Sequence, residues 1–217
     1  MYPIIRNRRL RASNALRSLV QETTLTVDDF IVPLFVVEGM GVKEEILSMP
    51  GQYRMSLDVL EDEIQELTTL KLKAVLLFAK TDDAKKDNEG VESWNPDGLM
   101  QRAIKTVKAT NSEMLVLTDV ALDPFSIYGH DGIVAGGKVL NDPTVEALCK
   151  MSVSHARAGA DLVAPSDMMD GRINEIRKAL DAEGFGDVGI LSYAAKYASA
   201  FYGPVRDALD SAPVDAE

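Results

Sequence analysis

One lysine near the end of the chain stands in surroundings that favour amine chemistry. Lys196 follows the apolar run 189–193, and no other cation occurs before Arg206. Tyrosine, phenylalanine and alanine dominate the intervening residues. A lysine at the end of a buried strand, inside such a shell, is poorly solvated as an ammonium, so its pKa falls and a fraction is free amine that attacks carbonyl groups to form a Schiff base. The alternative is a surface lysine whose stem lies over the rings.

Carboxylates form a second candidate group, at the end of an apolar stretch in the middle of the chain. Five alternate residues share one face of a strand there by the period of two: Leu115, Leu117, Asp119, Ala121 and Asp123. Asp131 follows in a glycine-containing loop. Three such carboxylates suit a hard cation such as magnesium, held through water, or a substrate ammonium. The alternative is that they are turn formers and caps.

Two further polar sites follow later strands. Ser166 and Asp167 open a loop before an expected helix, where Asp167 has the alternative role of a helix cap. Arg206 suits a substrate carboxylate, because a guanidinium binds one with two parallel hydrogen bonds. Its alternative role is a surface ion pair with a neighbouring aspartate.

Strands and helices alternate along the chain. Short apolar runs predict strands at 31–37, 73–78, 114–118, 161–165 and 188–193, and helical spacing predicts helices at 56–70, 97–109, 142–158 and 171–183. Residues 82–94 are polar and predict a long loop. This alternation is typical of right-handed βαβ units and a parallel sheet. It leaves open whether the sheet is a doubly wound open sheet or a (β/α)₈ barrel.

Several long sequence motifs resemble those of one family and occur in the same order as in that family. They are residues 31–36 (IVPLFV), 94–98 (WNPDG), 118–125 (TDVALDPF), 129–132 (GHDG), 163–172 (VAPSDMMDGR) and the stretch around Lys196. The family is porphobilinogen synthase, or 5-aminolevulinate dehydratase, and the similarity covers nearly the whole chain. The resemblance selects the TIM-type (β/α) barrel, with only the first five β/α units present. Five strands leave two sheet edges, which we expect a partner subunit or a C-terminal segment to cover.

The resemblance also implies roles for site residues. Lys196 resembles one of the family's two Schiff-base lysines, and Asp119 an active-site acid. Substrate-binding roles are implied for Ser166, Tyr202 and Arg206, with Asp123 and Asp131 at the same site. Zinc-dependent members carry three cysteines where this chain has Ala121, Asp123 and Asp131. Oxygen ligands disfavour zinc, so we expect the aspartate variant, with Asp123 and Asp131 as the metal candidates, magnesium as the cation and no catalytic zinc.

The reaction implied is the condensation of two molecules of 5-aminolevulinate to porphobilinogen in tetrapyrrole (heme) biosynthesis, which makes the protein a lyase. The family's second Schiff-base lysine lies in a motif on the next strand, and this sequence ends before that motif. The chain is therefore identified as a C-terminally truncated member. The alternative is a non-catalytic homologue that binds one substrate or assembles with other subunits.

Composition sets the remaining expectations. The formal charge of −11 disfavours nucleic acid and anionic membranes as partners. The chain has no apolar run of transmembrane length and no apolar signal segment, and its single cysteine, Cys149, excludes an internal disulfide, so we expect a cytoplasmic protein. Residues 1–25 hold a cluster of arginines and predict a basic N-terminal arm that docks on an acidic neighbouring subunit of a homo-oligomer, and residues 26–217 form the partial barrel.

Overall fold

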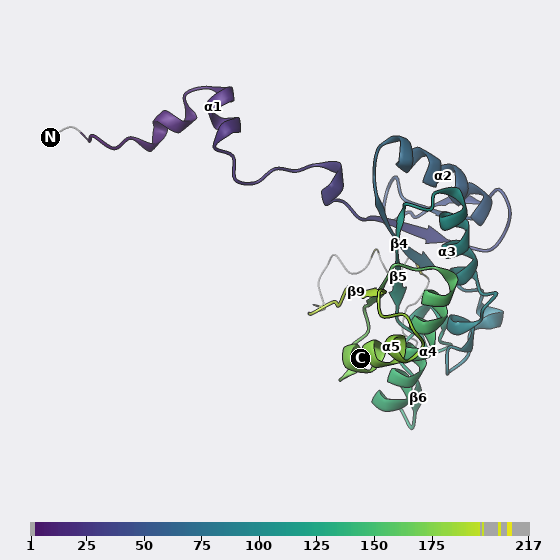
Figure 1. Cartoon of the computed structure of the whole chain (residues 1–217). Coiled ribbons are helices and arrows are strands. Elements are labelled where there is room, and N and C mark those ends of the chain that lie inside the picture. The colour runs from purple at the N-terminus through teal and green to yellow at the C-terminus, as the bar shows by residue number, and fades with distance from the viewer. Residues whose placement is uncertain (1–2, 196, 198–203, 205–207, 210–217) are drawn as a thin grey trace.

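The computed structural model describes residues 3–195, 197, 204, 208 and 209. Five parallel strands lie side by side in chain order: β1 (Val32–Val36), β4 (Ala74–Ala79), β5 (Leu115–Val120), β8 (Leu162–Pro165) and β9 (Gly189–Ile190). A helix connects each strand to the next: α2 (Leu57–Thr69), α3 (Leu99–Thr110), α4 (Asn141–Ala158) and α5 (Arg172–Ala182). The four helices cover the same side of the sheet (Figure 1). A doubly wound sheet would place helices on both sides, so the arrangement is that of consecutive (β/α) barrel units.

The strands are apolar on both faces because each face packs against something. The outer face packs on the helices: residues such as Val75 and Val116 meet α2 and α3, and Val163 meets α4 and α5. The inner face forms its own apolar layer from alternate residues of the same strands: Ala74, Leu76, Leu117 and Ala164. Since the two sets alternate along each strand, a shift by one residue would exchange the layers.

The sheet extends past β1, at an edge that we expected a partner subunit or a C-terminal segment to cover. β3 (Tyr53–Met55) pairs in parallel with β1, and β2 (Lys43–Glu45) pairs antiparallel with β3. Both strands have only three residues, too few to give an alternating pattern that the sequence could reveal. A separate hairpin joins β6 (Val134–Ala135) and β7 (Lys138–Val139).

The expected long loop at 82–94 contains two short 3₁₀ turns, η3 (Asp83–Lys85) and η4 (Val91–Trp94). A third, η5 (Asp123–Phe125), follows β5. The loop after β4 is tied to the loop after β5 by backbone hydrogen bonds from Asp87 to Phe125 and from Ile127 to Asp87. These contacts fix the connections at the carboxyl ends of the strands.

The N-terminal residues form an arm that extends away from the body (Figure 1). The arm contains η1 (Asn7–Arg11), α1 (Asn14–Leu19) and η2 (Val27–Asp29), and every residue from 3 to 31 is at least partly exposed. Among the residues that the structure describes, no helix is long and apolar enough to cross a membrane.

Candidate active site at the carboxyl ends of the strands

Asp119 and Ser166 meet at the carboxyl ends of two neighbouring strands. Asp119 lies on the inner face of β5, opposite Ala164 of β8, and Ser166 follows the last residue of β8. The Ser166 hydroxyl donates a hydrogen bond of 2.6 Å to Oδ1 of Asp119. Asp119 is only 5% exposed, so this bond holds a nearly buried carboxylate in one orientation. Two residues that the sequence singled out separately are therefore in direct contact.

Asp123 and Asp131 belong to the connection that follows β5. Asp123 begins η5, and both side chains are half-buried. Gly132, directly after Asp131, packs so closely on Thr144 that an added Cβ would stand 2.7 Å from Oγ1 of that residue. The amide of Ile133 donates to the same oxygen at 3.0 Å, so this part of the loop is anchored to α4.

The alternative role of Asp167 as a cap of α5 is wrong, because its carboxylate has other partners. Its Oδ1 accepts from the Met169 amide at 2.7 Å, and its Oδ2 forms an ion pair of 3.1 Å with Nε of Arg172. Gly171 occupies the N-cap position instead. Burial raises the pKa of the Asp167 carboxyl to about 6, and the negative charge of Asp131 adds to the increase, while the Met169 amide and Arg172 oppose it. Asp131 and Asp167 thus share one electrostatic environment.

Lys196, Tyr202 and Arg206 lie outside the described residues, so their side chains have no place in this description. The strand that precedes Lys196 is described. The ladder between β8 and β9 continues beyond Ile190 through hydrogen bonds from the Leu191 amide to Val163 and from the Tyr193 amide to Pro165. The carboxyl end of this strand therefore runs beside the loop that carries Ser166.

Two rings of the expected aromatic shell are not buried in the structure. Tyr193 is 40% exposed and Tyr197 is 81% exposed. The sequence pattern placed both beside Lys196, but adjacency in sequence does not bury a ring in the absence of packing partners.

The expected metal site depends on how closely the candidate ligand side chains lie to one another. Within 3–195, 197, 204, 208 and 209, no group of three or more His, Cys, Asp or Glu side chains is placed to hold an ion. Ala121, in the first of the three candidate positions, is buried and carries no donor atom. Asp123 and Asp131 offer oxygen donors alone, a set that suits a hard cation.

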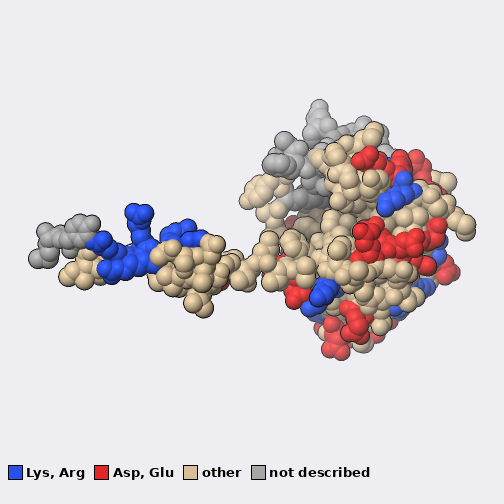
Figure 2. Space-filling view, turned by 90° about the horizontal axis from the view of Figure 1, so that it is seen from above, with Lys and Arg blue, Asp and Glu red and all other residues tan. Residues whose placement is uncertain are grey.

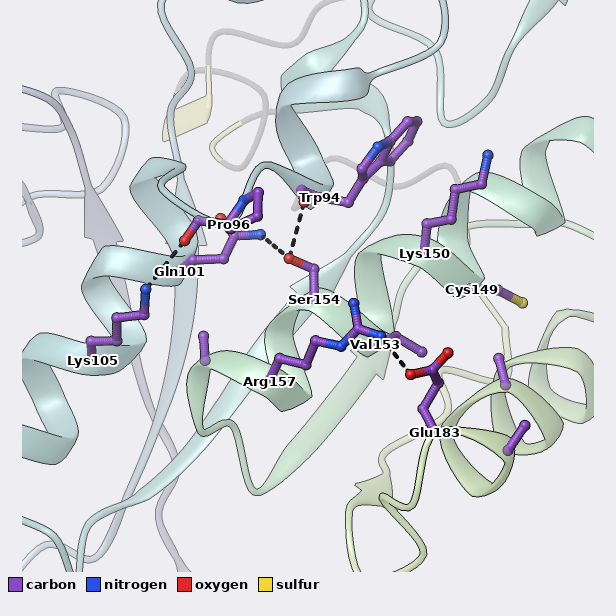
Figure 3. A pocket seen from close by; sticks show the side chains of 13 residues that line it. Trp94, Pro96, Gln101, Lys105, Cys149, Lys150, Val153, Ser154, Arg157 and Glu183 are labelled. Atoms are coloured by element: carbon purple, nitrogen blue, oxygen red, sulfur yellow. Dashed lines mark hydrogen bonds and ion pairs between the residues drawn. The ribbon is translucent and has the colours of Figure 1, made fainter.

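A cavity lies elsewhere, on the helix side of the sheet (Figure 3). Its volume is about 530 Å³, and residues of α3, α4 and α5 line it together with Trp94. Hydrogen bonds from Gln101 to Ser154 and from Ser154 to the Trp94 carbonyl cross its wall. Cys149 also lines it, and burial raises the pKa of this thiol to about 11. Because none of the predicted site residues lines the cavity, we place the candidate active site at the strand ends instead.

Comparison with known proteins identifies the family. The family model for delta-aminolevulinic acid dehydratase matches residues 4–217. The chain belongs to this family. Relatives include the delta-aminolevulinic acid dehydratases of Methanothermus sociabilis, 50% identical over 98% of this chain, and of Halalkalibacterium halodurans, 48% identical over 96%. A crystal structure of the family's enzyme from Toxoplasma gondii, solved with its product porphobilinogen, superposes with a TM-score of 0.95 at 50% identity and covers all of this chain.

The match also shows how much of the family's length is present. The chain spans 65% of the Methanothermus relative, 63% of the Halalkalibacterium relative and 62% of the Toxoplasma chain. The fold class expected from the sequence, a TIM-type barrel built from β/α units, is confirmed by this likeness.

Proposed function

We propose that this protein acts in the reaction of its family, the condensation of two 5-aminolevulinate molecules to porphobilinogen with release of two waters. The observation that supports this most directly is the hydrogen bond between Ser166 and Asp119 at the carboxyl ends of adjacent strands, where α/β barrels hold their active sites. The family match over residues 4–217 supports the same reaction.

In this proposal Lys196 is the nucleophile. Its amine attacks the keto carbon of one 5-aminolevulinate, and the addition product loses water to give a Schiff base. The two hydrogens of the amine leave with the carbonyl oxygen as that water, so atoms balance. An amine performs this attack only when it is uncharged. Binding both substrates in reacting geometry is what makes the later condensation fast.

Asp119 and Ser166 serve as the acid–base pair. A carboxylate that accepts a short hydrogen bond from a hydroxyl is oriented and ready to take a proton from the substrate's amine or to return one to the departing oxygen. Tyr202 and Arg206 bind the substrate carboxylate, the arginine through two parallel hydrogen bonds. These two roles depend on the family's pattern and on the proximity of both residues to Lys196 in the sequence.

We propose magnesium as the metal, held through water by Asp123 and Asp131. A bound Mg²⁺ would supply positive charge beside the substrate. The argument concerns the donors alone, since carboxylate oxygens suit a hard cation and a site without thiolates disfavours zinc.

We also propose a homo-oligomer in the cytoplasm, in which residues 1–25 are an arm and 26–217 the partial barrel. Figure 2 shows the arm's basic side chains gathered along it, while patches of Asp and Glu cover the visible face of the body. This complementarity, and exposed apolar residues of the arm such as Ile4, Ile5 and Leu19, support docking of the arm on another copy. The lone Cys149 suits a reducing compartment.

A colorimetric assay for porphobilinogen tests the proposal on the chain as it stands. We expect pyrrole formation from 5-aminolevulinate that Lys196→Met abolishes. Cys149→Ser is the control and should leave the rate unchanged, because a thiol with a pKa of about 11 is protonated at neutral pH. Absence of pyrrole would contradict the condensing activity and favour the alternative of a homologue that binds one substrate.

A further inference from the structure

Two arginines of α5 hold the two ends of β9. Arg177 donates from Nη1 to the Val188 carbonyl at 2.6 Å, just before the strand. Arg172 donates from Nη2 to the Tyr193 carbonyl at 3.2 Å, just beyond the strand. Each arginine also makes a second bond to a backbone carbonyl and one ion pair with an aspartate. The same helix therefore fixes the strand at its beginning and at its end.

The contacts of Arg172 link the strand end to the candidate active site. Its Nη1 donates to the Met169 carbonyl at 3.1 Å, and its Nε lies 3.1 Å from Oδ2 of Asp167, which is the residue after Ser166. The Asp167 side chain is fully buried and that of Arg172 is 17% exposed. The attraction within an ion pair removed from water in this way is screened less than that within a surface pair. The guanidinium thus connects the loop after β8 with the chain that leads to Lys196.

We infer that Arg172 is a positioning residue for the reaction, because it fixes the backbone at Tyr193, from which the chain leads to Lys196. Lys196 follows Tyr193 by three residues, so we expect the reactivity of Lys196 to depend on this anchored backbone. The expected effect of Arg172 on the reaction at Lys196 rests on the proposed function. Its effect on the backbone at Tyr193 does not.

Arg177 supplies the matched control. Arg177→Gln removes the same number of bonds from the same helix, but at the amino end of β9, which is farther from Lys196 along the sequence. We expect Arg172→Gln to slow formation of the borohydride-trapped adduct between 5-aminolevulinate and Lys196 about 10- to 100-fold, because small displacements of a reacting group have effects of this size. Arg177→Gln should change that rate less than about twofold, with a comparable loss of thermal stability.

Chemical rescue separates positioning from general destabilisation. Methylguanidinium should restore part of the adduct rate to Arg172→Ala and none to Arg177→Ala, and Arg172→Lys should remain impaired, since an ammonium cannot reproduce the fork of donors. Equal effects of the Arg172 and Arg177 variants, or failure of rescue, would overturn the inference.

Hydrogen exchange tests the backbone without any chemistry. Arg172→Gln should speed amide exchange in a peptide that covers 191–197, and Arg177→Gln should speed it in one that covers 185–190. If the wild-type chain formed no adduct, the proposed function would fail while the exchange result still decided the inference. Unchanged exchange at 191–197 in Arg172→Gln would refute it.

Discussion

At the scale of residues, the site is a set of carboxylates whose environments differ. Asp119 accepts a hydrogen bond from a serine, whereas Asp167 is buried against an arginine and its pKa is raised to about 6 by that burial. The period-two pattern predicted Asp119 correctly, because alternate residues of a strand share a face. The helix-cap alternative for Asp167 was wrong. A serine–aspartate pair before a helix is compatible with either role, and only the contacts in the structure distinguish them.

Loss of the Ser166 hydroxyl should affect the chemistry more than the fold. Ser166→Ala leaves the nearly buried Asp119 without this donor, so we expect porphobilinogen formation to fall about 10- to 100-fold and stability to fall by about 1 kcal/mol. Steady-state rates and urea unfolding measure the two effects. Ser112→Ala, in the exposed turn that precedes β5, is the control. A Ser166→Ala rate equal to wild type would remove the serine from the mechanism.

His155 should make stability depend on pH. It is fully buried in α4, 3.0 Å from Oγ1 of Thr118, and burial lowers its pKa to about 3 from the ordinary 6.5. A lowered pKa means that the unfolded chain binds the proton more tightly, so the contribution is complete above pH 6.5 and is lost as pH falls towards 3. At pH 4 the loss is about 3 kcal/mol.

Urea unfolding at pH 7 and at pH 4 measures this dependence. His155→Gln should be less stable at pH 7 but lose less stability on acidification than wild type does. His130→Gln, which alters the only other histidine, should keep the wild-type difference between the two pH values. An unchanged difference in His155→Gln would show that this histidine is not the titrating group.

At the scale of elements, the strands with apolar runs were predicted to within a few residues. Apolar runs revealed both β4, in which all six residues are apolar, and β5, which begins with three apolar residues. It missed β3, whose three residues include the nearly buried Arg54; this side chain donates to the Ala208 carbonyl and forms an ion pair with Glu44. Because the partners of Arg54 lie far away in the sequence or on another strand, no local sequence pattern predicts these contacts. β9 was predicted longer than its two residues, although its ladder continues to Tyr193.

Gly132 should prove essential to the loop that carries Asp131. Gly132→Ala would drive a methyl group into Thr144 and Val139, both 2.7 Å from the added carbon, so we expect a loss of about 1–3 kcal/mol together with reduced activity. Gly186→Ala is the control, because the nearest atom lies 4.0 Å away, and its stability should change by less than about 0.5 kcal/mol. Urea unfolding measures both. Equal free energies of unfolding for the two variants would show that the loop accommodates the methyl group without loss of stability.

At the scale of the whole molecule, charge is divided between a basic arm and an acidic body. The division was visible in the sequence as a cluster of arginines in a chain of net charge −11. How far the arm extends from the body was not (Figure 1), because extension depends on the absence of packing partners within the chain.

Light scattering should therefore report an oligomer that depends on the arm. Deletion of residues 1–25 should give a smaller species, and raising the salt concentration should weaken the full-length assembly, since exposed opposite charges are screened. Substitution of the arm's arginines by glutamine should act like salt. A full-length chain that runs as a monomer would contradict docking of the arm.

The central claim is that Lys196 bonds covalently to the keto group of the substrate. Incubation with 5-aminolevulinate, reduction with borohydride and peptide mass spectrometry locate the bond directly. We predict one modified peptide, the one that contains Lys196, and no modification of that peptide in Lys196→Met. An unlabelled chain, or a label on another lysine such as Lys80, would contradict the account.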